Sequence, residues 1–225
     1  MTFTKWAALL LAATLSIAAA PRAGNWNAAV AVTSAGGHVM GNPDAPLKLA
    51  EYVSYTCSHC ADFQREADAP LLIYFVRPGK VSIEVRHLVR DPIDLTVAML
   101  ANCGEPAKFF RNHNAFLKGQ ARWMARLDSA SEGERRRWTS GDAAARRRAI
   151  ASAFGFYAIM EGLGYGRPAA DRCLADEAMA RRLAAQTREA ASIGVAGTPS
   201  FLLNGELLAG THDWRSLEAQ LRARL

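Results

Sequence analysis

Cys57-Ser58-His59-Cys60 is the stretch that decides how this chain folds, because of what stands on either side of it. It follows an apolar, strand-like run, Leu47 to Val53, and precedes a run with helical character, Ala61 to Phe75. Two cysteines three positions apart at a helix start lie close enough to form and break a disulfide with each other. The positive end of the helix dipole favours the thiolate of Cys57, which is the reactive species. A strand, a C-x-x-C motif and a helix in this order predict dithiol redox chemistry.

The first residues of the chain have the features of a signal peptide. Lys5 gives a short positive region, an apolar run covers Trp6 to Ile17, and Ala18-Ala19-Ala20 supplies the small residues that a signal peptidase requires. We therefore expect a signal peptide over residues 1–23, export to the periplasm, and a linker over residues 24–37. The alternative is an uncleaved membrane anchor, although the apolar run is short for a membrane span.

The composition is that of a globular protein with a basic surface. The chain has 225 residues, of which 50% are hydrophobic and 21% charged, and its net charge is +6. The arginine runs 135–137 and 146–148 lie in segments with helical spacing, where three consecutive residues spread over more than half of the helix circumference. No zinc-finger or RNA-binding motif accompanies them. We interpret the charge as a solvated surface and expect no nucleic-acid partner.

Strand and helix patterns divide the rest of the chain into two kinds of segment. The strand-like stretches are residues 38–40, 47–53, 81–88, 200–203 and 206–208. The helical stretches beside them are residues 58–76 and 213–225. Asn204-Gly205 is a strong hairpin signal between the last two strands. The segment between the two groups of strands is rich in Ala and Arg and has helical spacing. The patterns predict an α/β domain built from residues 38–90 and 194–225, with an all-helical insertion over residues 91–193.

Two metal-based interpretations of the motif compete with the redox one. Covalent haem attachment requires C-x-x-C-H, but Ala61 follows Cys60. A structural zinc site normally requires a second cysteine or histidine pair, whereas Cys103 and Cys173 stand alone and far apart. We therefore favour redox chemistry with no metal and no organic cofactor, and keep metal binding and an inert disulfide as alternatives.

Gly197-Thr198-Pro199, directly before the hairpin, adds to the motif. Proline cannot donate to a sheet ladder, so at the start of a strand it marks an edge or a special turn. With this segment, the Cys57-Ser58-His59-Cys60 motif, the helical insertion and the β-β-α ending, the chain resembles the DsbA-like branch of the thioredoxin superfamily. The resemblance implies an α/β thioredoxin fold, a central mixed sheet with flanking helices, interrupted by the insertion. It also implies that Pro199 is cis and lies against the active disulfide, and that the backbone of Thr198 binds substrate.

Glu51 and His59 are the other candidate catalytic residues. Glu51 shares a strand face with aliphatic residues, where a carboxylate costs free energy unless it is protonated, paired or hydrated. The family places an acid there, near the buried thiol, so Glu51 is the candidate proton acceptor for Cys60. An acid facing solvent at a strand edge is the alternative. The lysine that some members pair with this acid is replaced by Val85. A protonated His59 would stabilise the Cys57 thiolate and make the pair more oxidising.

Cys103 and Cys173 both fall in the predicted insertion. They form either a structural disulfide or two unrelated buried thiols, and export favours the disulfide. Closing a loop of this length would stabilise the fold by roughly 4 kcal/mol through the entropy of the unfolded chain.

The leading functional hypothesis is an exported thiol:disulfide oxidoreductase that introduces disulfides into reduced or misoxidised exported proteins. The resemblance implies a quinone-linked membrane partner that reoxidises the pair. A periplasmic reductase or isomerase is the alternative within the same chemistry. A thiol-dependent metal-binding or chaperone-like module is the alternative from another class.

Overall fold

The computed structural model describes residues 25–225, and the predicted signal peptide over residues 1–23 lies outside them. Within the described residues, the strands form one mixed sheet in the order β1-β2-β4-β3-β5-β6. The strands are β1 (Val30–Val32), β2 (His38–Met40), β3 (Leu47–Val53), β4 (Val81–His87), β5 (Ser200–Leu203) and β6 (Glu206–Leu207). β3 runs parallel to β4 and antiparallel to β5, so the central strand joins the segments before and after the insertion.

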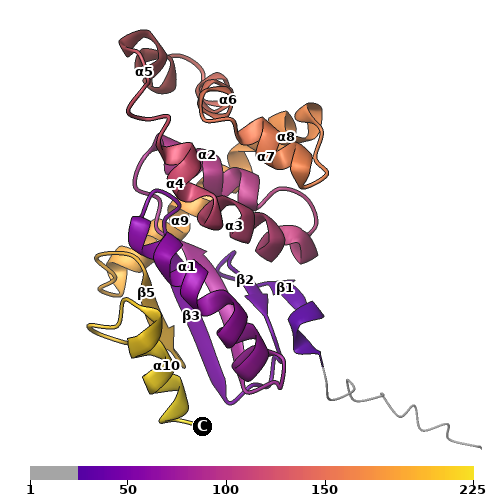
Figure 1. Cartoon of the computed structure of the whole chain (residues 1–225), viewed down its shortest axis with the longest axis vertical. Coiled ribbons are helices and arrows are strands. Elements are labelled where there is room, and N and C mark those ends of the chain that lie inside the picture. The colour runs from indigo at the N-terminus through magenta and orange to yellow at the C-terminus, as the bar shows by residue number, and fades with distance from the viewer. Residues whose placement is uncertain (1–24) are drawn as a thin grey trace, which may run out of the picture.

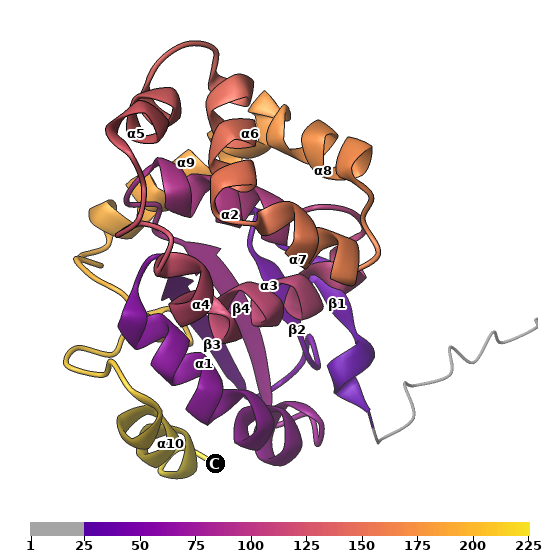
Figure 2. The ribbon, with the colours of Figure 1, turned by 45° about the horizontal axis from the view of Figure 1, so that its top comes forward.

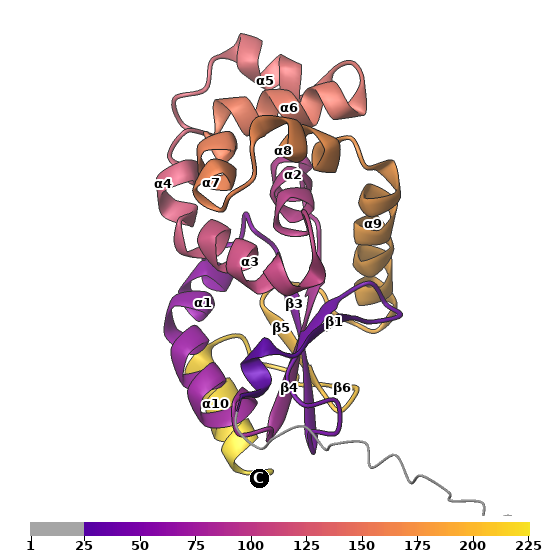
Figure 3. The same ribbon diagram turned by 90° about the vertical axis from the view of Figure 1, so that its right-hand side faces the viewer.

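Helices cover both faces of the sheet and form a block at one end of it (Figure 1). α1 (Ser58–Leu71) and α10 (Trp214–Arg222) lie on one side of the sheet, and α9 (Glu177–Ser192) lies on the other (Figure 3). The other α-helices are α2 (Pro92–Ala101), α3 (Phe109–Lys118), α4 (Gln120–Met124), α5 (Glu132–Thr139), α6 (Ala143–Ala153), α7 (Phe156–Gly162) and α8 (Arg167–Leu174). Short 3-10 turns occur at Trp26–Ala28 and Pro106–Lys108. None of the helices between residues 25 and 225 is long and apolar enough to cross a membrane.

The β3-α1-β4 unit carries the C-x-x-C motif. Only Lys48 of β3 is exposed, as expected for a central strand with both faces covered. α1 continues as a π-helix over Leu72–Val76, and the chain then turns at Gly79 with φ +80°. A Cβ at Gly79 would lie 2.9 Å from Nε1 of Trp26, so both the conformation and the space there favour glycine.

The β5–β6 hairpin and α10 complete the sheet domain. Asn204 and Gly205 have φ values of 52° and 88°, as the predicted tight hairpin turn requires. The Asn204 side chain also accepts a hydrogen bond of 2.8 Å from the backbone N–H of Lys48, which fixes the hairpin to the start of β3. Asp213 caps α10 by accepting from the backbone N–H of Ser216.

The helical insertion runs from α2 to α9 (Figure 2). Its apolar side chains form one core with Val53 of β3, Val85 of β4 and the two cysteines of the motif. Its fully buried side chains include Phe116, Leu117, Ile150, Phe156 and Met160. A disulfide between Cys103 and Cys173 joins the segment after α2 to α8. The two sheet segments and the block between them make up the predicted thioredoxin fold with an all-helical insertion.

Two expectations about exposed segments were wrong. Residues 24–37, expected to be a linker, contain β1, which pairs with β2 through a turn in which the N–H of Thr33 donates to the carbonyl of Gly37. A strand of three residues among small polar ones has too short a pattern to be recognised. Arg147, expected on a solvated surface, is buried, and it binds Glu177 and the carbonyl of Leu174.

Candidate active site

Cys57 lies where the segment after β3 becomes α1, and it faces the segment before β5. It is the N-cap residue of α1, and its carbonyl accepts from the backbone N–H of Ala61. The Sγ of Cys57 lies 3.1 Å from the carbonyl oxygen of Thr198, 141 residues further along the chain. The Thr198–Pro199 peptide bond is cis. The structure therefore brings Cys57, Thr198 and Pro199 into one site, in which Cys57 and Cys60 are not joined by a disulfide.

The two thiols of the motif have opposite acidities. A hydrogen bond with Cys60, helped by Thr198 and by the charge of Arg90, lowers the pKa of Cys57 to about 5, although burial opposes this. Burial raises the pKa of Cys60 well above its usual value, and the Cys57 hydrogen bond and the charge of Glu51 act in the same direction. At neutral pH Cys57 is therefore a thiolate and Cys60 a thiol. Cys57 is 5% exposed and Cys60 0%, so a reagent in solution meets Cys57 first.

Arg90 is the cation whose charge lowers the pKa of Cys57. Its Nε donates to the Ser54 hydroxyl at 3.0 Å and its Nη2 to the Thr56 hydroxyl at 3.2 Å. His59, by contrast, is exposed, and within residues 25–225 its side chain makes no hydrogen bond or ion pair. The predicted contribution of His59 to the thiolate stays a prediction.

Glu51 is buried in the middle of β3. It is 1% exposed, its Oε1 has no hydrogen-bond partner, and burial raises its pKa to about 8. Its neighbour in the parallel register is Val85, the residue expected in place of the lysine that some family members carry. A cavity of about 30 Å³ adjoins Glu51 and is also lined by Gln64 and His113, and a cavity of this size can hold a water molecule.

Side chains from the insertion hold the segment before the motif in place. The Asp94 carboxylate accepts from the Ser54 hydroxyl at 2.6 Å and from the backbone N–H of Tyr55 at 2.7 Å. Gln120, at the start of α4, donates from Nε2 to the carbonyls of Tyr55 at 2.6 Å and of Cys57 at 2.7 Å. Both Asp94 and Gln120 are buried, so these bonds are protected from water.

Sequence reasoning missed these supporting residues. Asp91-Pro92 marks a helix start, and this signal could have placed Asp94 in the first turn of α2. Gln120 has no such signal, because its partners lie more than sixty residues away in sequence. His212 is also new: its Nδ1 lies 2.8 Å from the carbonyl oxygen of Pro199 and supports the cis-proline segment from the stretch that follows β6.

Comparison with known proteins gives one consistent family. Residues 33–223 match the family described as Thioredoxin. The crystal structure of a protein-disulfide isomerase from Novosphingobium aromaticivorans is 53% identical, with a TM-score of 0.81, over 84% of this chain and 97% of that one. The structure of Wolbachia pipientis alpha-DsbA1 has a TM-score of 0.61 at 21% identity, over 83% of this chain and 89% of that one, which shows a shared fold.

A curated relative in Rickettsia bellii carries the name "Putative protein-disulfide oxidoreductase". It is 31% identical over 86 residues, which are 38% of this chain. The match spans 33% of the length of that relative.

The acidity of Cys57 predicts a pH dependence for its alkylation. In the reduced protein, the rate of reaction with iodoacetamide should rise with a midpoint near pH 5 and then level off, because the pKa of Cys57 is lowered to about 5. Between pH 5 and pH 9, Cys57 is a thiol in the unfolded chain and a thiolate in the folded one, because its pKa is lowered from 9.0 to about 5. The unfolded chain therefore binds more protons, and the unfolding free energy of the reduced protein should rise with pH in this window relative to that of the disulfide form. Cys57→Ser should abolish the fast reaction. A midpoint close to pH 9 would contradict the assignment.

Gln120→Leu tests whether the insertion sets the reactivity of the motif. The change leaves the carbonyl of Tyr55 without its donor and the carbonyl of Cys57 with the backbone N–H of Ala61 alone, which should cost about 1–3 kcal/mol of unfolding free energy. It should also move the alkylation midpoint of Cys57 upward, because the freed segment no longer holds Cys57 against Cys60. Gln220→Leu, which removes one hydrogen bond from α10 to Thr211, is the matched control and should leave the midpoint in place. Equal midpoints in all three proteins would refute the role of Gln120.

Proposed function

The chain belongs to the thioredoxin family, and we propose that it is an exported thiol:disulfide oxidoreductase that introduces disulfides into substrate proteins. The observation that carries the proposal is the contrast between the two motif thiols: the pKa of Cys57 is lowered to about 5, while that of Cys60 is raised. A stable thiolate stabilises the reduced form of the pair, and a couple with a stabilised reduced form is a stronger oxidant. DsbA is an established example of a couple that is strongly oxidising for this reason.

The proposed cycle begins with the Cys57–Cys60 disulfide. A substrate thiolate attacks Sγ of Cys57, a substrate–Cys57 bond forms, and the Cys57–Cys60 bond breaks with the electron pair leaving on Cys60. A second substrate thiolate then attacks the substrate sulfur of the mixed disulfide and releases Cys57 as a thiolate. The substrate has lost two electrons and the enzyme has become a dithiol. The low pKa of Cys57 makes it a good leaving group in the second step.

Glu51 is proposed to manage the proton on Cys60. Because the pKa of Cys60 is raised, the thiolate that leaves in the first step needs a proton. Glu51 has a pKa of about 8, so it is mostly protonated at neutral pH and can supply that proton. When the pair is reoxidised, the Glu51 carboxylate takes the proton back, which is the predicted acceptor role. Water in the adjoining cavity, beside Gln64 and His113, offers a route for exchange with solvent.

Thr198 and Pro199 are proposed to receive the substrate chain. The carbonyl oxygen of Thr198 lies 3.1 Å from the Cys57 sulfur, so a backbone group near it would be close to the reacting atoms. Backbone pairing with an extended segment depends little on side chains, which suits an enzyme with many unfolded substrates. His212, through the Pro199 carbonyl, holds this segment in position.

The cellular setting is part of the proposal. Lys5, the apolar run from Trp6 to Ile17 and the alanines at 18–20 support export to the periplasm, where disulfides persist. The substrates would be reduced or misoxidised exported proteins. The dithiol formed in each cycle requires an oxidant, and a quinone-linked membrane partner would supply it. We propose no nucleic-acid partner for the basic surface.

An isomerase or reductase is the second candidate, because the relative that is 53% identical carries the name protein-disulfide isomerase. Such an enzyme uses the same Cys57 thiolate but is kept reduced, and it attacks wrong disulfides instead of making new ones. Metal binding by the motif has less support, since no group of three or more His, Cys, Asp or Glu within residues 25–225 is arranged to hold a metal ion.

The oxidase proposal is tested by mixing the oxidised protein with a reduced, unfolded cysteine protein and following loss of substrate thiols. Wild type should oxidise the substrate, whereas Cys57→Ser and Cys60→Ala should not, because neither variant can form the Cys57–Cys60 disulfide. If wild type oxidised no substrate thiols, and both wild type and Cys57→Ser bound the unfolded protein, a chaperone-like module would be favoured. The reduction potential of the pair should lie well above the value of about −270 mV for thioredoxin. A potential at or below that value, with activity only on scrambled disulfides, would favour the reductase or isomerase.

Glu51→Gln tests the proton transfer, since it keeps the shape of the side chain and removes its ionisation. The formation of the mixed disulfide at pH 7 should slow on the order of 100-fold. Because the pKa of Glu51 is raised from 4.5 to about 8, wild type loses stability relative to the variant as pH rises from about 4.5, and the loss should level off above about 8. An unchanged rate, together with this stability difference, would mean that Glu51 is buried without acting on Cys60.

A further inference from the structure

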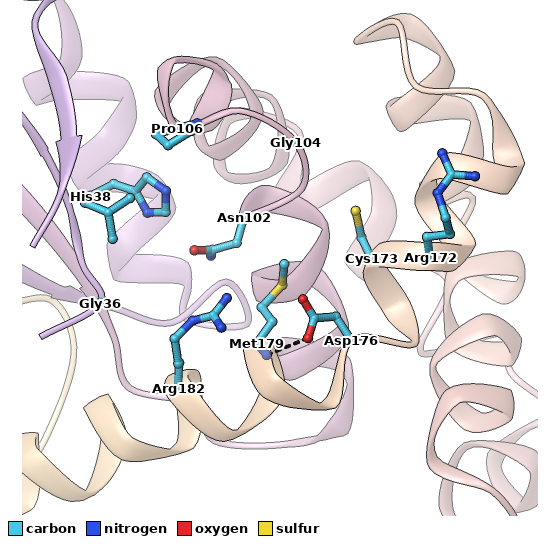
Figure 4. A pocket seen from close by; sticks show the side chains of 11 residues that line it. Gly36, His38, Asn102, Gly104, Pro106, Arg172, Cys173, Asp176, Met179 and Arg182 are labelled. Atoms are coloured by element: carbon cyan, nitrogen blue, oxygen red, sulfur yellow. Dashed lines mark hydrogen bonds between the residues drawn. The ribbon is translucent and has the colours of Figure 1, made fainter. Parts of the chain in front are cut away.

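A cavity of about 430 Å³ lies where three parts of the chain meet, and none of its lining residues belongs to the dithiol site (Figure 4). The β1–β2 hairpin contributes His38, the segment after α2 contributes Asn102, and α8 and α9 contribute the remaining wall. Its volume lies within the range of small-molecule sites. The Cys103–Cys173 disulfide joins two of the three walls, which holds them at a fixed separation.

His38 is a buried polar side chain with no partner in this cavity. It is 7% exposed, its ring stacks on Phe109 at 4.0 Å, and its Nδ1 has no hydrogen bond. A buried polar atom without a partner costs about 1–3 kcal/mol, so such atoms are rare unless a ligand or water meets them. Burial, helped by the charges of His87 and Arg182, lowers the pKa of His38 to about 4, and the neutral ring has one N–H and one lone pair to offer.

Arg182 brings a positive charge to the same space. Its side chain points from α9 toward Asn102 and His38, whereas Arg172 stands at the opposite edge (Figure 4). Both arginines are exposed, and within residues 25–225 neither makes a hydrogen bond or an ion pair with another side chain or the backbone. Arg86 and Arg147, by contrast, bind carboxylates of Glu84, Glu189 and Glu177. The exposed guanidinium of Arg182 therefore has its donors available to a ligand that enters the cavity.

Hydrogen-bond acceptors stand beside this cation. Asn102 donates from Nδ2 to the carbonyl of Ala98 at 2.8 Å, and this fixes the amide so that its Oδ1 is left as an acceptor. Asp176 caps α9 by accepting from the backbone N–H of Met179 at 2.9 Å, which uses one of its carboxylate oxygens. A bare phosphate or sulfate would meet the Asp176 charge and leave both acceptors unpaired, so it fits this wall poorly.

We propose that this cavity binds the α-carboxylate end of an amino acid or peptide. The carboxylate would accept hydrogen bonds from Arg182 and His38, as a planar guanidinium favours carboxylates. The neighbouring N–H or ammonium of the ligand would donate to Oδ1 of Asn102 or to Asp176. This arrangement satisfies the unpartnered His38, the unpaired Arg182 and the free acceptors with one ligand. A free amino acid and the C-terminus of a peptide share this chemistry.

The test is an NMR titration of the protein with both disulfides formed, using alanyl-alanine and alanyl-alaninamide. The free acid should cause saturable shifts at His38, Asn102 and Arg182, while the amide, which lacks the carboxylate, should cause none. Arg182→Ala should weaken binding at least tenfold. Arg188→Ala, an exposed arginine of the same helix outside the cavity, is the matched control and should bind like wild type. L-Alanine as a third ligand separates the two sources: binding like the dipeptide points to free amino acids, and loss of binding points to peptide ends.

His38→Phe keeps the ring that stacks on Phe109 and removes its polar atoms, so it should weaken binding while the folded spectrum is retained. Equal binding of the acid and the amide, or of Arg182→Ala and Arg188→Ala, would overturn the proposal, as would the absence of saturation. Cys57→Ser should bind the dipeptide like wild type, so the result does not depend on the proposed redox function.

Discussion

The contact between the Cys57 sulfur and the carbonyl of Thr198 is the constraint on which the rest of the site depends. It joins two segments that are 141 residues apart, and the antiparallel pairing of β3 with β5, which sets Glu51 opposite Phe201, brings them to the same end of the sheet. A shift of one residue in this register would turn the side chains of β5 to the other face and move Pro199 away from the motif. The buried β3–β5 pair therefore fixes the geometry of the chemistry.

The second organising feature is that two chemically identical thiols stand in different surroundings. Cys57 shares hydrogen bonds with Cys60 and Thr198 and has the charge of Arg90 nearby, whereas Cys60 lies in the apolar core with the carboxyl of Glu51. The same pair of sulfurs thus supplies a stable anion and a neutral thiol within one turn of helix. Cys57, the less buried of the two sulfurs, is the one that an incoming thiolate reaches first, and its low pKa also makes it the better leaving group.

Much of this arrangement could be predicted from local sequence, and the rest could not for physical reasons. The C-x-x-C motif, the Thr198-Pro199 segment and the Asn204-Gly205 turn each have a short pattern with a direct structural meaning, and the α/β fold with its helical insertion follows from their order. β1 was missed because three residues carry little periodicity. Gln120 and Asp94 were missed because their partners are fixed by tertiary packing, which no local pattern encodes.

Gln120 has a consequence for how the fold can be divided. Its amide donates from the first turn of α4 to two carbonyls of the segment that bears the reactive sulfur. The helical insertion therefore helps to position the motif. Grafting Cys57-Ser58-His59-Cys60 onto a sheet scaffold without the insertion would transfer the four residues without the Gln120 hydrogen bonds that hold the segment in place. A protein engineer who moves the motif should therefore move the sheet domain and the helical insertion together.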